Sequence, residues 1–481
     1  MDKLYITTSI PYVNAQPHIG FVLELVQADV IARFRRLGGW DVHFQTGTDE
    51  NATKNAIAAQ KAGLPTGELV DRNSECFRRL LPAFGISNDA FIRTTEQRHR
   101  LGVHAFWRRL RPQDVYRGAY QGLYCVGCED FLGERDLVDG RCPDHDEPPV
   151  QTAEENYFFR LSAYQDQIER LLSDGTIAVI PQARRNEVLS FVRRGLADIS
   201  ISRTTQRSLG WGIRVPGDDD HVIYVWIDAL INYISGLGFG QDDRWQEWWQ
   251  AGVRKLHVIG KNVWKFHAIY WPALLLSAHL PLPDTIAVHG FVTVDGKKIG
   301  KSLGNAVDPF DCARRFGPDA VRYYLLRAIP PFDDGDFSAD RLREVYNADL
   351  ANGLGNLVSR IVALCGRAGF GPLTAPPEHE APEGYLAAME GLRFDLALQS
   401  LWRVVDDLNR QVEQVKPWEL LKRPDLAPLH GHLRRWTSQL LRLAYWLGPL
   451  LPETSQRIGQ QLQRPLAPTA SHPKAPLFPR L

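Results

Sequence analysis

Pro17-His18-Ile19-Gly20-Phe21 separates a predicted strand from a long predicted helix near the N-terminus. The strand is an apolar, β-prone run, Leu4-Tyr5-Ile6-Thr7-Thr8, and the helix is predicted because apolar residues recur at helical spacing through 22–34. A strand, a tight turn and a helix N-terminus can bind an anion, because backbone N–H groups and the helix dipole face the turn. Taken alone, the stretch fits an ordinary strand–helix crossover with a surface histidine better than a nucleotide site.

Length and composition favour a multidomain globular enzyme. The chain has 481 residues, which predicts two to four domains, and its 13 Trp fit packed cores. Lys+Arg and Asp+Glu both number 56, so a nucleic-acid site would have to come from local clustering of charge. The sequence contains no apolar run of membrane-spanning length, and Met1-Asp2-Lys3 leads directly into a strand without a signal peptide. We therefore expect a cytoplasmic protein.

The first 112 residues alternate between strand and helix patterns. Gly38-Gly39 ends the first helix, a strand follows at 40–44, and residues 46–51 read as a turn that includes Asp49. This order predicts a doubly wound parallel sheet, whose ligands bind at the carboxyl ends of its strands. His18 and Asp49 both follow such ends. Further strands are predicted at 222–226, 255–260 and 287–294, and helices at 52–62, 66–84, 347–368, 387–415 and 429–451.

A cysteine cluster lies in a segment that breaks this alternation. Cys125-x-x-Cys128 is followed by Cys142-x-x-His145. Three thiolates and one imidazole form a closed tetrahedral set for a structural zinc ion. A pair of redox thiols is the alternative, but the second half-site favours zinc.

A lysine-rich loop follows the last predicted strand of the sheet. Residues 295–305 contain Lys297, Lys298 and Lys301 among glycines, together with Ser302. A flexible cationic loop can wrap a triphosphate and neutralise charge on a leaving group. The spacing is not that of a P-loop, and a solvated lysine-rich turn is the default interpretation of the loop alone.

Together these motifs resemble those of the class I aminoacyl-tRNA synthetases, specifically the methionyl-tRNA synthetase family. Residues 17–20 match most of its HIGH signature, residues 298–302 match KMSKS in position, and the cysteine cluster lies in the expected insertion. The resemblance implies ATP-dependent activation of methionine and transfer to initiator and elongator tRNA(Met), with Mg²⁺ on the ATP. The implied catalytic residues are His18, Gly20, Lys298, Lys301 and Ser302.

The resemblance also implies a methionine pocket. Asp49 pairs with the α-ammonium group, and Ile10 and Tyr12 contact the side chain. The remaining wall is Trp226, Ala229, Tyr233, Val263, Phe266 and His267. An aromatic, apolar slot suits a flexible thioether, and Tyr12 and His267 offer polar groups for the sulfur. From spacing alone, core packing is the better explanation of these aromatics.

The helical C-terminal part carries a second implied site. In the family, Asn356, Arg360 and Trp418 read the CAU anticodon. A splayed RNA base stacks on an aromatic face and bonds its edges to planar donors, which Trp418 and Arg360 supply.

Five positions depart from the family pattern: Phe21, Asn51, Asn262, Ile299 and Gly300. Phe21 is the most serious, since it replaces the second histidine of HIGH. Losing one donor to a transition-state charge can cost roughly a hundredfold in rate. The alternatives are therefore a synthetase paralogue with another acceptor or altered activation, a catalytically silent tRNA-binding protein and, more distantly, a generic nucleotide-binding Rossmann protein.

The resulting prediction is a Rossmann-type α/β fold with a zinc-knuckle insertion, followed by an all-α anticodon-binding bundle. We expect a monomer, because no separate dimerisation module follows the bundle. The predicted parts are a catalytic domain in two halves (1–112 and 219–282), the insertion (113–218), a stem-contact region (283–345), the anticodon-binding domain (346–462) and a proline-rich tail (463–481).

Overall fold

The computed structural model describes residues 2–125, 130–132, 137–143, 147–299, 305–373, 379–463 and 476–481. The chain divides into two compact units. The first, here called the sheet unit, comprises Met1–Pro17, Gly39–Leu81 and Asn88–His289. The second, the bundle unit, comprises His18–Gly38, Pro82–Ser87 and Gly290–Leu481.

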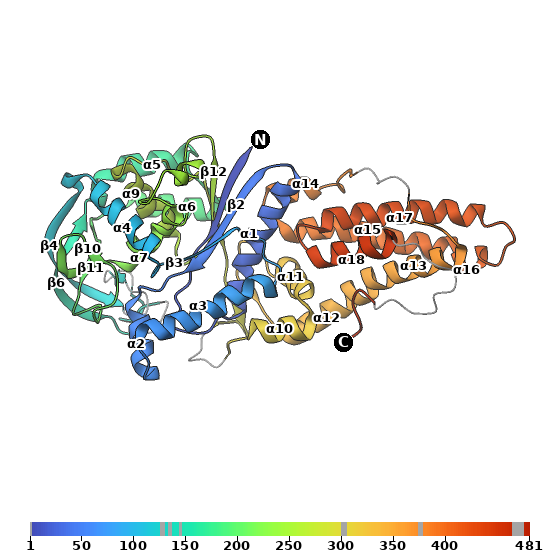
Figure 1. Cartoon of the computed structure of the whole chain (residues 1–481), viewed down its shortest axis with the longest axis horizontal. Coiled ribbons are helices and arrows are strands. Elements are labelled where there is room, and N and C mark those ends of the chain that lie inside the picture. The colour runs from blue at the N-terminus through green and yellow to red at the C-terminus, as the bar shows by residue number, and fades with distance from the viewer. Residues whose placement is uncertain are drawn as a thin grey trace. The chain divides into compact units, whose positions relative to one another are not determined.

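A six-stranded parallel sheet forms the centre of the sheet unit, in the order β3-β2-β1-β12-β13-β7. Figure 1 labels β2, β3 and β12 of this sheet. The strands are Ala90–Arg93 (β3), Asp41–Thr48 (β2), Lys3–Thr8 (β1), Arg254–Gly260 (β12), Thr285–His289 (β13) and Ala178–Ile180 (β7). Strand β1 is buried from Leu4 onward, as expected for a parallel strand covered on both faces. The predicted α/β fold with a parallel sheet is therefore confirmed.

Three predicted strand boundaries were wrong. The single strand predicted at 287–294 is two strands of different sheets, Thr285–His289 (β13) and Val292–Val294 (β14). Strand β2 continues through Thr48, so Thr46-Gly47-Thr48 is strand and not turn. A Cβ on Gly47 would lie 2.1 Å from the Ile92 carbonyl oxygen of β3, so only glycine allows this close approach. The predicted strand at 222–226 ends at Ile223, and a helix begins at Val225. The prediction was wrong because a short apolar run does not distinguish a strand from a buried helix.

The segment predicted as an insertion forms two antiparallel sheets. One contains Asp130–Leu132 (β5), Val115–Cys125 (β4), Val150–Phe159 (β6) and Ile199–Ser200 (β8). The other contains Arg214–Val215 (β10), Asp218–Ile223 (β11) and Ser202–Thr204 (β9). The same segment supplies β7, the edge strand of the parallel sheet. The helices of the unit include Thr53–Ala62 (α2), Thr66–Ala83 (α3), Gln97–Arg109 (α4), Gln165–Ser173 (α5), Gln182–Arg193 (α6), Val225–Leu230 (α7), Asn232–Ser235 (α8) and Trp271–Ser277 (α9).

The bundle unit is mainly helical, and Figure 1 shows its last long helices side by side in orange and red. Its helices include Ile19–Leu37 (α1), Pro309–Phe316 (α10), Pro318–Arg327 (α11), Ala339–Val345 (α12), Asn356–Ala368 (α13), Tyr385–Glu390 (α14), Phe394–Val415 (α15), Pro417–Leu420 (α16), Ala427–Leu447 (α17) and Pro452–Gln463 (α18). The π-helix Tyr346–Gly355 (η7) leads into α13. The predicted helix at 387–415 is broken between α14 and α15, where Leu392 has a φ of 56°. The helical C-terminal region is confirmed.

The last residues of the predicted proline-rich tail are packed. Leu477 and Phe478 are buried, and the Phe478 ring lies 5.8 Å from the ring of Tyr346. The rest of the tail lies outside the described residues. In the described part of the chain, no helix combines the length and apolarity that a membrane crossing requires.

Candidate functional site

The loops that follow β1 and β2 meet at one edge of the parallel sheet. Tyr12 and Asp49 form a parallel β-bridge, and the Asp49 N–H donates to the Pro11 carbonyl oxygen at 2.9 Å. Adjacent parallel strands place their carboxyl ends together, which explains the pairing. Asp49 is almost fully buried. Two residues predicted for the methionine pocket are therefore neighbours.

Three aromatic side chains extend this edge into an aromatic wall, formed by Tyr12, Trp226 and Phe266. The Tyr12 and Trp226 ring centroids lie 5.6 Å apart in an edge-on arrangement. Trp226, on α7, stacks on Phe266 at 4.0 Å with an angle of 10° between the rings. Phe266 begins a π-helical turn, a feature frequent at functional sites. The wall joins three segments that are distant in sequence.

Tyr233 and His267 form a buried pair in the same unit. Nδ1 of His267 lies 2.9 Å from the Val263 carbonyl oxygen, so Nδ1–H donates, and Nε2 accepts from the Tyr233 hydroxyl at 2.6 Å. Burial lowers the pKa of His267 to about 4, although the hydrogen bond to Val263 opposes this shift. His267 is therefore neutral near pH 7, and it orients Tyr233 through a hydrogen bond.

Two further predicted pocket residues have less distinctive surroundings. Ala229 is buried on α7, the helix that carries Trp226. Ile10 is half-buried in the loop directly after β1. Their contact with a methionine side chain stays a prediction.

A buried ion pair beside Asp49 was not predicted from the sequence. The Glu50 carboxylate is fully buried and accepts two hydrogen bonds from Arg93, at 2.7 and 3.0 Å. The Glu50 carbonyl oxygen accepts from the Trp211 indole N–H at 2.7 Å. These bonds fix the backbone next to Asp49. The adjacent acidic residues Asp49 and Glu50 could have indicated this ion pair, because two neighbouring carboxylates cannot both be buried without partners.

A second buried network surrounds Asn51, one of the residues predicted to depart from the family pattern. Asn51 donates from its amide to Asp228 at 2.7 Å and to the Thr94 carbonyl oxygen at 3.0 Å. Asp228 also bonds to Nε2 of His99 at 2.5 Å. The asparagine amide thus donates two hydrogen bonds within this network. Lys54, also missed, lies 4.0 Å above the Tyr12 ring as a cation–π pair.

In the bundle unit, His18 caps the N-terminus of α1. Its Nδ1 accepts from the Gly20 N–H at 3.2 Å. A Cβ on Gly20 would lie 2.9 Å from His18 Cε1, so a larger residue at this position would displace the imidazole from the cap. The ring of Phe21 lies 4.4 Å from the imidazole of His18. His18, Gly20 and Phe21 thus form one compact group at the start of α1.

The lysine loop begins as a β-hairpin of Val292–Val294 (β14) and Lys297–Lys298 (β15). Asp295 and Gly296 both have positive φ, 54° and 68°, as a two-residue type I′ turn requires. Asp336 accepts from Gly296 N–H at 2.8 Å and from the Thr293 hydroxyl at 2.7 Å, and these bonds lower its pKa. Lys301 and Ser302 lie outside the described residues, as does the side chain of Lys298.

The predicted anticodon residues lie on two neighbouring segments of the bundle. Asn356 and Arg360 are one turn apart on α13, and the Arg360 guanidinium lies 5.9 Å from the Trp418 ring centroid. Trp418 is 37% exposed, unusual for this side chain. Arg360 also pairs with Glu413 at 2.8 Å, a partly exposed bridge that costs little to break.

The predicted zinc ligands are only partly within the described residues. Cys125 ends β4 and is buried, and Cys142 is also buried. Cys128 and His145 lie outside the described residues. Among the residues that are described, no group of three possible metal ligands is found.

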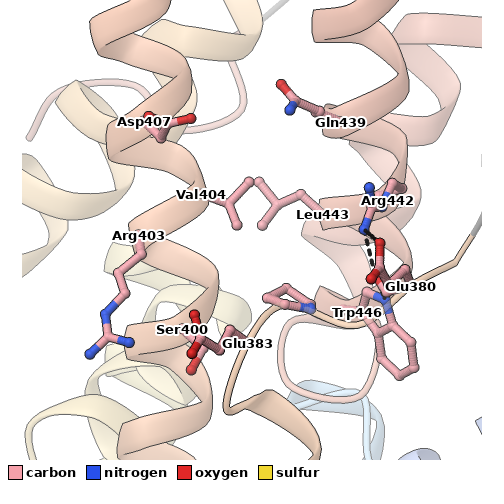
Figure 2. A pocket seen from close by; sticks show the side chains of 11 residues that line it. Glu380, Glu383, Ser400, Arg403, Val404, Asp407, Gln439, Arg442, Leu443 and Trp446 are labelled. Carbon is pink, nitrogen blue, oxygen red and sulfur yellow. Dashed lines mark hydrogen bonds and ion pairs between the residues drawn. The ribbon is translucent and has the colours of Figure 1, made fainter.

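A cavity of about 320 Å³ lies between α15 and α17 (Figure 2). Its wall includes Glu380, Glu383 and Asp407, and Arg442 donates to Glu380 at 3.2 Å. The lining also contains the guanidinium groups of Arg403 and Arg442, so the charges of the cavity largely cancel and do not favour a highly charged ligand such as ATP. None of the predicted site residues lines it.

A family model described as tRNA synthetases class I (M) matches residues 4–148 and 145–362. Fold and match together define the class, a class I tRNA synthetase. Among curated relatives, methionine–tRNA ligase of Thermotoga maritima is 42% identical over 488 residues, which cover 98% of this chain and 77% of the relative. That of Mycobacterium tuberculosis (strain ATCC 25618 / H37Rv) is 42% identical over 481 residues, 95% of this chain and 91% of the relative.

A solved structure has the same fold over the whole length. The crystal structure of Mycobacterium tuberculosis methionyl-tRNA synthetase bound by methionyl-adenylate superimposes with a TM-score of 0.91 at 37% identity, and it covers 99% of this chain and 100% of that one. The chain belongs to the methionyl-tRNA synthetase family.

Proposed function

We propose that the chain activates L-methionine with ATP to methionyl-adenylate and transfers the methionyl group to tRNA(Met), releasing AMP and pyrophosphate. The aromatic wall of Tyr12, Trp226 and Phe266 beside Asp49 carries this proposal. Aromatic rings attract a thioether by dispersion and sulfur–aromatic contact, and a buried carboxylate suits the α-ammonium group. A relative of the same fold is described with methionyl-adenylate bound, which supports the assignment.

For the activation step, we assign the phosphate-side roles to the start of α1 and the lysine loop. The methionine carboxylate attacks the α-phosphate of Mg²⁺-ATP in line, and pyrophosphate leaves. His18, Lys298 and Lys301 stabilise charge on the phosphates, and Gly20 and Ser302 complete this site. The protein contributes positioning and charge stabilisation, without a covalent intermediate on a side chain.

Replacement of Asp49 tests the methionine assignment. Asp49→Asn is expected to raise the KM for methionine by about a hundredfold or more in ATP–pyrophosphate exchange, because truncating one partner of a buried charge pair costs about 2–5 kcal/mol. The KM for ATP should change much less. Asp41→Asn, at the exposed start of β2, is the matched control and should leave both values unchanged. An unchanged KM for methionine in Asp49→Asn would overturn the role.

For tRNA recognition, we assign the anticodon site to Asn356, Arg360 and Trp418 within residues 346–462, and stem contacts to residues 283–345. The exposed Trp418 face is suited to stacking with a splayed base. Arg360 is close enough to that ring to bond to the edge of the same base once its bridge to Glu413 opens. The partners are then initiator and elongator tRNA(Met).

We further assign a structural zinc ion to Cys125, Cys128, Cys142 and His145. The two described thiols are buried and their residue types suit a closed tetrahedral site, where the metal would stabilise the local fold. Cys125→Ser is expected to lower the zinc content from one equivalent to near zero by elemental analysis. Cys312→Ser is the control, because burial raises the pKa of that thiol to about 11 and keeps it protonated. Retention of zinc by Cys125→Ser would exclude the site.

The chain is expected to act in the cytoplasm, where tRNA is charged for translation, and as a monomer. A second candidate is a synthetase paralogue that uses another acceptor or activates slowly. Phe21 favours it, because a phenyl ring cannot donate a hydrogen bond to a phosphate.

A further inference from the structure

We infer that Phe21 is a positioning residue that holds the His18 imidazole in one orientation and one tautomer, a role that rests on the proposed activation function. Nδ1 of His18 lies 3.2 Å from the Gly20 nitrogen, whose N–H can only donate. Nδ1 is therefore the acceptor, and the proton of the neutral ring lies on Nε2. His18 can present an Nε2–H donor as long as this cap hydrogen bond persists.

The imidazole of His18 is in contact with the Phe21 ring and the Gly20 backbone. The Phe21 ring centroid lies 4.4 Å from that of His18, with an angle of 36° between the rings. A Cβ on Gly20 would lie 3.0 Å from Nδ1 and 3.9 Å from the side chain of Ile299, which is itself buried. The imidazole is thus held against the bare glycine backbone while the phenyl ring packs against it.

The cap hydrogen bond and the contact with Phe21 both depend on the orientation of the imidazole. Rotation of the imidazole by half a turn would replace Nδ1 with a carbon and break the cap hydrogen bond. The phenyl ring restricts this rotation by contact, since aromatic pairs at this separation attract each other in defined orientations. A donor fixed before the reaction needs no reorganisation as charge develops, which is the condition for effective stabilisation. Phenylalanine therefore acts on the reaction through His18, whereas the family's histidine at this position is itself polar.

Phe21→Leu is the decisive variant, because it keeps an apolar side chain and removes the ring face. Two measurements are made on the full chain. In ATP–pyrophosphate exchange with methionine, kcat should fall about tenfold or more, because small misplacements of a catalytic group have large effects on rate. The KM for methionine should stay the same. In ¹⁵N-histidine NMR, with the His18 signal assigned by its loss in His18→Asn, the wild type should show an unprotonated Nδ1 and a protonated Nε2. Phe21→Leu should show averaged tautomers.

Two controls separate positioning from simple packing. Phe34→Leu removes a ring from the same helix, where Phe34 pairs with Tyr385 at 6.3 Å. It should lower stability without changing the His18 signals or kcat. In a His18→Asn background, Phe21→Leu should cause no further loss, since its effect is transmitted through the imidazole. Phe21→Tyr, which retains the ring, should keep the wild-type tautomer.

An equal loss of kcat from Phe21→Leu in both backgrounds, or an unchanged His18 tautomer in Phe21→Leu, would overturn the inference. Absence of methionine-dependent exchange in the wild type would instead refute the proposed function. The NMR comparison would then still decide whether Phe21 fixes His18, because it needs no turnover.

Discussion

At the scale of single residues, buried polar groups distinguish the candidate site from an ordinary aromatic core. Asp49, Glu50 and His267 are each less than one-twentieth exposed. The sequence predicted Asp49 and His267 from a resemblance. It could not reveal that His267 bonds to Tyr233 and Val263, because hydrogen-bond partners distant in sequence depend on the folded chain. Glu50 and Asp228 escaped prediction for the same reason.

The buried histidine predicts a loss of stability in mild acid. His267 has a folded pKa of about 4, against 6.5 for the exposed group, so the unfolded chain takes up its proton first as the pH falls. The contribution of neutral His267 to the stability of the folded chain is complete above pH 6.5 and is lost progressively towards pH 4. It amounts to about 3 kcal/mol at 1.36 kcal/mol per pKa unit. Burial lowers the pKa of His257 as well, which adds a loss of the same sign.

Urea unfolding between pH 4 and 6.5 measures this effect. His267→Gln should give a shallower dependence of the unfolding free energy on pH, because one of the two titrations is removed. The exposed His379 provides the control, and His379→Gln should keep the wild-type slope. The same slope in all three proteins would show that His267 does not titrate in this way.

At the scale of elements, strong periodic patterns were predictable and short apolar runs were not. The strand at 255–260 and the long helices α1, α15 and α17 were expected near their observed positions. Residues 222–226 were misassigned, because an apolar run of this length fits a strand and a buried helix equally. Gly391 caps α14 and marks the break before α15, a stop signal that the predicted helix at 387–415 overlooked, and Leu392 then takes a left-handed φ of 56°.

A buried ion pair joins α1 to α11 within the bundle unit. Asp29 and Arg322 are fully buried and lie 2.8 Å apart. Arg322 also donates to the carbonyl oxygens of Phe84 and Leu450, at 3.1 and 2.9 Å. Burial favours the protonated form of Asp29, but the charges of Arg322 and Arg33 outweigh this and lower its pKa. The pair therefore remains ionised and anchors the helix that carries His18.

Arg322→Met is expected to destabilise the protein by about 3–5 kcal/mol, because it leaves Asp29 as a buried charge without its main partner. Asp29→Asn/Arg322→Met should recover part of that loss. Arg36→Met, on the partly exposed side of α1, should cost no more than about 1 kcal/mol. Thermal and urea unfolding measure all three variants. A double variant less stable than Arg322→Met would contradict the expected coupling.

At the scale of the whole molecule, each unit carries one part of the proposed reaction. The residues assigned to the methionine pocket lie in the sheet unit, and His18 and the residues assigned to the anticodon site lie in the bundle unit. The resemblance placed the anticodon residues apart from the methionine pocket, but it placed His18 with that pocket in residues 1–112. The alternation of the two units along the chain was not predictable, because α1 and the short segment Pro82–Ser87 belong to the bundle unit although they precede most of the sheet.

The assignment of the anticodon site predicts that a substitution there weakens tRNA charging without affecting methionine activation. Trp418→Ala should raise the KM for tRNA(Met) in charging by about tenfold or more, since stacking of one base on an aromatic ring is worth about 1–3 kcal/mol. Methionine-dependent ATP–pyrophosphate exchange should be unchanged. Leu386→Ala, another exposed apolar side chain of the bundle unit, should affect neither assay. Equal charging by Trp418→Ala and the wild type would remove Trp418 from the site.

The most direct test of the central claim is ATP–pyrophosphate exchange by the full chain with each standard amino acid in turn. Exchange is predicted with L-methionine, at a specificity constant about a hundredfold or more above that of any other amino acid, because a pocket of fixed aromatic shape and one buried carboxylate favours the thioether side chain. Faster exchange with another amino acid, or no exchange with methionine, would contradict the claim.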